Sequence, residues 1–67
     1  MSLAKEINAI TVACDKVPMA KRCSLWAQAW DSARAAAAAH KNYRHVEVRN
    51  HLRSAKTFLQ AHKEKHK

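Results

Sequence analysis

Apolar and basic positions separate along the last third of the chain when it is wound into one α-helix. At about 100° per residue, they form two adjoining stripes on the helix surface. The apolar stripe contains Val48, Leu52, Ala55, Phe58, Leu59 and His62. The other stripe, the basic face, contains His45, Arg49, Arg53, Lys56 and Lys63. A helix with this pattern buries the first stripe and presents the second to water or to an anion, so residues 44–62 are predicted to be helical.

A second helical pattern covers residues 19–39. Its apolar arc contains Met19, Cys23, Trp26, Trp30, Ala33 and Ala37. Pro18 precedes the pattern, and proline ends a preceding helix but is well suited to the start of a new one. Residues 40–45 are the natural turn, where Asn42 can adopt a left-handed conformation or cap the helix. The two patterns predict a mostly α fold built on an antiparallel two-helix hairpin.

The first sixteen residues fit two structures. Leu3, Ile7, Ile10 and Cys14 recur at helical spacing, which favours a short N-terminal helix. However, Ile10, Val12 and Cys14 alternate as in a strand, and β-branched side chains favour extended backbone. We expect residues 9–14 to be extended or a short strand, paired with its symmetry mate or laid over the helices. The helical alternative stays open.

The size of the chain limits its core. It has 67 residues, no glycine and one proline, and alanine inflates its 48 % hydrophobic content. A chain of this length buries only about 60 % of its unfolded surface. We therefore expect a single small helical domain over residues 1–67 that gains its missing stability as a homodimer. Seven large side chains are placed at the dimer core or along a cleft for a partner: Met19, Trp26, Trp30, Val48, Leu52, Phe58 and Leu59.

The charge balance favours polyanionic partners. Thirteen lysines and arginines against five acidic residues give a formal net charge of +8. Nucleic acid, acidic proteins and anionic membranes all attract such a chain. The basic face could follow a phosphate backbone, or it could be a solvated surface that keeps the protein soluble. There is no run of about 20 apolar residues and no signal-peptide pattern, so we expect a cytoplasmic protein without a membrane partner.

Candidate chemistry is sparse. The five acidic residues are scattered, and no serine or cysteine stands in a known catalytic signature, so we expect no enzyme activity. Cys14 and Cys23 lack a metal-binding spacing and are interpreted as reduced thiols. His62 and His66 stand four residues apart and could share a metal on one helical face, but strong binding needs further ligands. We therefore expect no cofactor and no bound metal.

Size and composition also suggest a family. The order ITVACDKVPMAKRCSLWAQAW followed by NYRHVEVRNHLRSAKTFLQAHK resembles the small early lytic-development proteins of lambdoid temperate phages, encoded between the exonuclease and excisionase genes. Some of these are short, largely helical dimers with an extended segment. The resemblance implies a non-enzymatic protein of the host cytoplasm, expressed early in infection, that binds a host or phage protein and promotes lytic development.

The expected function is therefore a non-catalytic, dimeric protein-interaction module with an apolar cleft rimmed by basic residues. The alternative is a small basic nucleic-acid-binding protein that uses the basic face. Steep salt dependence and loss of binding after charge reversal would favour the alternative.

Overall fold

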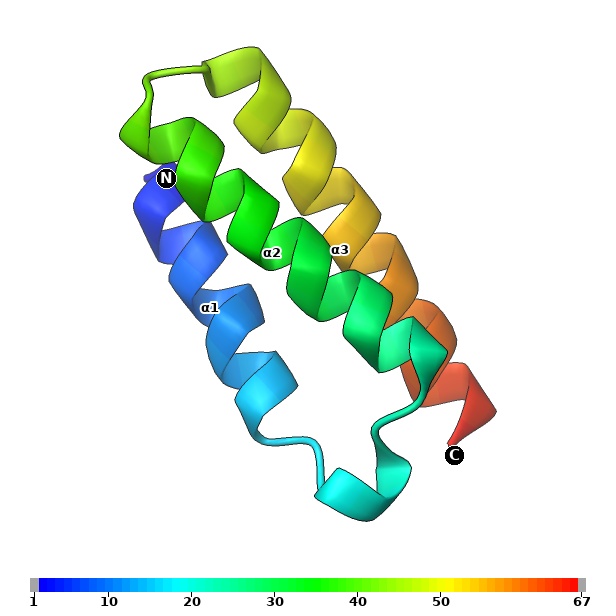
Figure 1. Ribbon diagram of the computed structural model, residues 1–67. Coiled ribbons are helices and arrows are strands. Elements are labelled where there is room, and N and C mark those ends of the chain that lie inside the picture. The colour runs from blue at the N-terminus through cyan, green and yellow to red at the C-terminus, as the bar shows by residue number, and fades with distance from the viewer. Residues whose placement is uncertain (1, 67) are drawn as a thin grey trace.

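The computed structural model describes residues 2–66, which are mostly helical. Helix α1 spans Leu3–Asp15, the short 3₁₀ helix η1 spans Met19–Lys21, α2 spans Ser24–Lys41, and α3 spans His45–Lys65. The three α-helices lie side by side, and each runs antiparallel to the one before it (Figure 1). The most extensive packing is between α2 and α3, with α1 laid against both. The predicted mostly α class is confirmed, and residues 2–66 contain no strand.

The core lies where the three helices meet. Helix α2 contributes only alanines to it, and these small side chains let the neighbouring helix backbones approach closely. Helix α1 and helix α3 supply larger apolar side chains. The buried apolar residues are Ile7, Ile10, Cys14, Ala29, Ala33, Ala36, Ala39, Val48, Leu52 and Ala55. None of the helices in the described chain is long and apolar enough to cross a membrane.

The expected extended segment over residues 9–14 is wrong, because these residues belong to α1. Ile7, Ile10 and Cys14 are buried on one face of that helix, whereas Val12 is exposed. Burial of this face outweighs the weak strand preference of the β-branched residues. The hydroxyl of Thr11 also donates a hydrogen bond of 2.9 Å to the carbonyl oxygen of Ile7, so this polar group has a partner within the helix. The open alternative, a short N-terminal helix, is what the structure contains.

Helix α2 begins later than the predicted residue 19. Pro18 has an extended ψ of 143°, η1 follows it, and Arg22 returns to extended backbone with a ψ of 99°. The Arg22 guanidinium donates to the carbonyl oxygens of Val17 and Asp15, at 3.1 and 3.3 Å. These bonds fasten the link between α1 and α2 in a non-helical path. Met19, expected in the apolar arc, is 81 % exposed and lies outside the core.

The turn between α2 and α3 lies within the predicted residues 40–45. Asn42 caps the end of α2, and its side-chain amide donates a hydrogen bond of 3.0 Å to the carbonyl oxygen of Ala38. The left-handed residue is Tyr43, with a φ of 59°, rather than Asn42. The left-handed backbone at Tyr43 makes this turn tight, and its side chain is exposed and does not add to the core.

We predict that Ala33→Leu destabilises the fold, because Ala33 is 1 % exposed in the close packing around α2. Overpacking a core of this kind costs about 1–3 kcal/mol. Ala37→Leu, one turn away at an exposed position, is the matched control and should change the free energy of unfolding little. Urea unfolding followed by circular dichroism measures both. Equal effects of the two substitutions would contradict the packing described above.

Candidate binding groove and cysteine–histidine cluster

Three members of the basic face line one side of an open groove between α1 and α3. Arg49, Arg53 and Lys56 occupy successive turns of α3 and face Glu6 of α1 across this groove. The groove has a volume of about 600 Å³. Its complete lining is Leu3, Glu6, Arg49, Leu52, Arg53, Lys56 and Thr57. The amphipathic pattern of α3 produces this arrangement, because burial of its apolar stripe turns the adjoining basic stripe toward the edge of α1.

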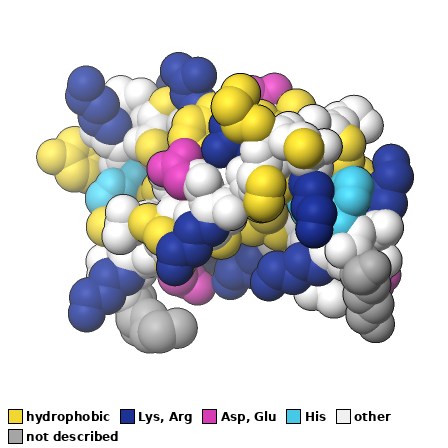
Figure 2. All heavy atoms as spheres, turned by 90° about the horizontal axis from the view of Figure 1, so that it is seen from below, with side chains coloured by type: hydrophobic (Ala, Val, Ile, Leu, Met, Phe, Trp, Pro, Cys, Tyr) yellow, Lys and Arg dark blue, Asp and Glu magenta, His cyan; other side chains and the backbone are white. Residues whose placement is uncertain are grey.

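The groove has an excess of positive charge. The Lys56 ammonium lies 3.3 Å from a Glu6 carboxylate oxygen, and its side chain is largely exposed. An exposed ion pair of this kind contributes little stability, so this contact leaves Lys56 available to a ligand. Arg49 and Arg53 form no ion pair with any residue between 2 and 66. Basic side chains are spread over the face seen in Figure 2, with few acidic ones among them.

The other two members of the basic face lie elsewhere. His45 begins α3, and its ring meets the ring of His40 edge-on, with centroids 6.4 Å apart. Lys63 borders a separate hollow of about 280 Å³ beside His62 and His66. The structure therefore gathers only the central part of the predicted basic face into one groove.

The tryptophan pair fastens α1 to α2 and does not line the groove. The rings of Trp26 and Trp30 are stacked, with centroids 5.8 Å apart and an interplanar angle of 10°. The indole N–H of Trp26 donates a hydrogen bond of 2.9 Å to the carbonyl oxygen of Cys14, and the Arg22 guanidinium lies 4.6 Å from the ring centroid. Both tryptophans are half-buried against the core. These contacts give the pair a structural role within one chain.

The remaining apolar residues predicted for a dimer core or partner cleft lie in α3. Val48 and Leu52 are buried, and Leu52 also reaches the floor of the groove. Phe58 and Leu59 are half-buried and pack against the core. Of the seven residues predicted for this role, Leu52 alone borders the groove.

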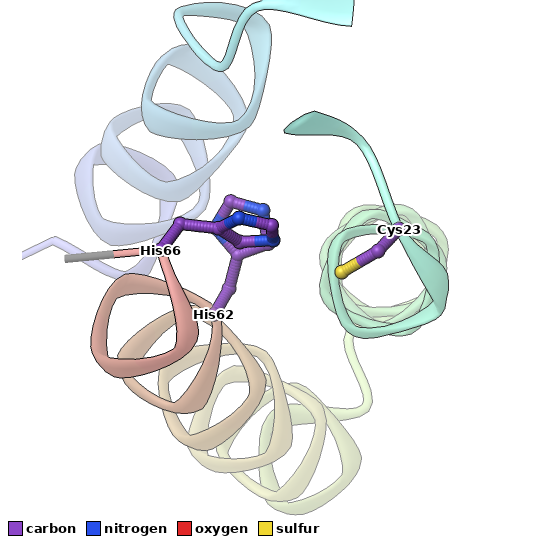
Figure 3. A group of neighbouring side chains, drawn as sticks. All are labelled: Cys23, His62 and His66. Carbon is purple, nitrogen blue, oxygen red and sulfur yellow. The ribbon is translucent and has the colours of Figure 1, made fainter. Parts of the chain in front are cut away.

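A second group of functional side chains lies at the other end of α3. One ligand atom each from Cys23, His62 and His66 lies within 4.8 Å of the others. The Cys23 sulfur points toward the two imidazoles (Figure 3). Cys23 is the N-cap residue of α2, His62 is on the last turn of α3, and His66 is the C-cap residue of that helix. The antiparallel packing of these helices brings the start of one beside the end of the other (Figure 1).

The two histidines of this cluster differ in their hydrogen bonding. His62 is 4 % exposed, and its Nε2 lies 2.8 Å from the carbonyl oxygen of Lys21. The ring centroids of His62 and His66 are 4.5 Å apart. The buried Nε2 of His66 has no hydrogen-bond partner among residues 2–66. A buried ring nitrogen without a partner is unusual in a folded protein, and it lies in this cluster.

The pKa values of the two thiols are shifted in opposite directions. The pKa of Cys23 is lowered, first by the backbone N–H of Trp26 and further by that of Leu25 and the positive charge of Lys65. Burial raises the pKa of Cys14, and the carboxylate of Asp15 adds to this effect. Cys23 is half-buried whereas Cys14 is fully buried. Cys23 is therefore the thiol that can act as a nucleophile or a ligand.

The sequence pointed to only part of this cluster. The four-residue spacing of His62 and His66 places both on one helical face, as expected. Cys23 is distant from the two histidines in the sequence, and its position beside them depends on where α2 begins. The earlier expectation of no bound metal depended on the lack of further ligands, and the fold brings one to the histidine pair.

No family model, curated protein or solved structure matches this chain.

We predict that Cys23 is alkylated faster than Cys14 in the native protein, by about tenfold or more, because it has the lower pKa and the greater access. The lowered pKa gives Cys23 more thiolate at neutral pH, and its rate should level off at a lower pH than that of a free thiol. Iodoacetamide labelling with mass-spectrometric site assignment measures the two rates. The difference should disappear in denaturant, and equal native rates would contradict the assigned environments.

Proposed function

We propose that this protein is a non-catalytic interaction module that binds an acidic segment of a partner protein in the groove between α1 and α3. The observation that carries the proposal is the alignment of Arg49, Arg53 and Lys56 along one wall of that groove. Their charges are opposed there by one carboxylate, that of Glu6. Carboxylates of a partner would complement this wall, and arginine forks bind them in bidentate geometry.

The groove favours a protein segment over a nucleic acid because its lining is not uniformly basic. Leu3 is half-buried at the groove, above the buried Leu52, and provides an apolar contact that suits a side chain of an amphipathic peptide. A partner segment with several acidic residues around one apolar side chain would complement both the basic and the apolar parts of this lining.

The wider biological setting rests on the sequence resemblance. It suggests a regulator expressed early in phage infection that acts on a host or phage protein to promote lytic development. The groove adds a chemical requirement to that hypothesis, namely an acidic surface on the target.

We also propose that the protein forms a homodimer. Half of the buried apolar residues are alanines, so the core buries few large side chains. A chain of this size with such a core is expected to be marginally stable alone. Val46 and Tyr43 are 74 % and 83 % exposed near the turn between α2 and α3, where a second copy could cover them.

The nucleic-acid alternative retains one specific argument. Arg49 and Arg53 lie on an exposed helix face without ion-pair partners within residues 2–66. A duplex could contact this face through its phosphates without entering the groove.

We predict that Arg49→Glu with Arg53→Glu weakens binding of an acidic amphipathic peptide of glutamate and leucine by about tenfold or more, equivalent to about 1.4 kcal/mol or more. Arg34→Glu with Lys41→Glu makes the same change in net charge at exposed positions of α2 and should have a much smaller effect. Fluorescence anisotropy with a labelled peptide measures the dissociation constants. Equal losses in both double variants would show general charge attraction and contradict a groove.

The same titration with a random-sequence DNA duplex separates the two functions. The proposal predicts tighter binding of the peptide and a modest salt dependence. Tighter binding of the duplex, with an affinity that falls steeply with salt and disappears in the Arg49 and Arg53 variant, would support the nucleic-acid alternative instead.

For the homodimer, we predict a mass about twice the 7.6 kDa of the chain in sedimentation equilibrium at micromolar concentration. Val46→Lys is the variant expected to shift the equilibrium toward monomer, because Val46 is exposed within one chain. A wild-type monomer throughout this concentration range would reject the dimer and leave the groove proposal unaffected.

A further inference from the structure

We propose that Cys23, His62 and His66 bind a zinc ion that fastens the end of α3 to the start of α2. The three residues offer one sulfur and two imidazole nitrogens, a ligand combination found in tetrahedral zinc sites. Their ligand atoms lie within 4.8 Å of one another. This site is separate from the groove between α1 and α3 and does not depend on the function proposed for it.

The distances are close to those a metal requires. In a tetrahedral site with bond lengths of about 2.0–2.3 Å, ligand atoms are about 3.3–3.8 Å apart. The cluster therefore needs to contract by about 1 Å, which side-chain rotations can supply without moving the helices. The two histidines already stand one helical turn apart, with ring centroids separated by 4.5 Å. Such a pair on one helix face forms two of the ligands in known zinc motifs.

The unpartnered nitrogen of His66 is an independent observation in favour of a ligand. This buried Nε2 has no hydrogen-bond partner among the described residues. Burial of a polar atom without a partner costs free energy, and coordination would remove that cost. The cluster contains the thiol of Cys23, whose sulfur points toward the imidazoles (Figure 3).

A hydrogen bond also prepares His62 for coordination. Its Nε2 lies 2.8 Å from the carbonyl oxygen of Lys21 and donates to it, since a carbonyl oxygen can only accept. In that tautomer the lone pair is on Nδ1, which is the atom through which His62 would bind zinc. A backbone carbonyl bonded to the second nitrogen of a histidine is a common outer contact of metal sites and holds the ring in place.

The surroundings set limits on the affinity. Lys16, Lys21 and Lys63 border the adjoining hollow, and their positive charges oppose a dication. All three side chains are exposed, so water and salt screen this repulsion. The Cys23 thiolate neutralises one of the two charges of the ion. With three protein ligands and a water molecule in the fourth position, we expect a dissociation constant in the micromolar range.

Zinc at this position would stabilise the fold. It would link residues that are far apart in sequence, at the end of the bundle where the chain leaves η1 and where α3 terminates. Small domains with limited cores often use a structural metal for this purpose. The ion would bind the folded chain in preference to the unfolded chain, and the melting temperature would rise with zinc concentration.

The test uses full-length protein without a histidine tag, reduced with a phosphine that does not replace the thiol as a ligand. Cobalt(II) is the first probe, because thiolate coordination produces a charge-transfer band in the near ultraviolet. We expect one cobalt per chain, displacement of that band by zinc, and a higher melting temperature in zinc than in EDTA. The absence of the band, or no change in melting temperature with zinc, would overturn the proposal.

Variants assign the ligands. Cys23→Ser removes the thiolate, and serine is itself a good N-cap residue, so α2 should remain folded. We expect Cys23→Ser and His66→Ala each to weaken zinc binding by about a hundredfold, and Cys23→Ser to abolish the cobalt band. His45→Ala, at the opposite end of α3, is the matched control and should bind as wild type. Wild-type affinity in either cluster variant, with folding verified by circular dichroism, would contradict the site.

Discussion

The close antiparallel packing around the alanines of α2 is the constraint on which the rest of the structure depends. Ala29, Ala33 and Ala36 are fully buried, and their small side chains let α3 and α1 approach the α2 backbone. This packing fixes the rotation of α3 because Val48 and Leu52 must point inward. Once that rotation is fixed, the basic residues that adjoin the apolar stripe can only lie at the edge of the bundle.

Two chemically different sites follow from this arrangement. Along the middle of α3, the edge that meets α1 becomes a groove with Arg49, Arg53 and Lys56 on one wall. At the end of α3, the same antiparallel path brings His62 and His66 to the first residues of α2. The groove is suited to carboxylates of a partner, whereas the cluster offers nitrogen and sulfur to a metal ion. Under the two proposals, one helix contributes to both recognition and stability.

Structural features that depend on local periodicity could be predicted from the sequence, whereas features that depend on long-range packing could not. The strong amphipathic pattern of α3 was sufficient to define its basic face. Residues 9–14 were expected to be extended because β-branched residues weaken a helical pattern. Burial of one face of this segment against α2 and α3 stabilises the helix instead. Met19 was placed in the core because its spacing fits, but the path around Arg22 turns it outward. The approach of Cys23 to His62 required the packing of α2 against α3.

The most direct test of the central claim is an NMR titration of the ¹⁵N-labelled protein with the acidic amphipathic peptide. We predict that amide shifts concentrate on the α1 and α3 residues around the groove, at Leu3, Glu6, Arg49, Arg53 and Lys56. Residues on the outer face of α2 should shift little. Shifts centred on α2, or shifts spread evenly over all exposed lysines and arginines, would contradict a binding site between α1 and α3.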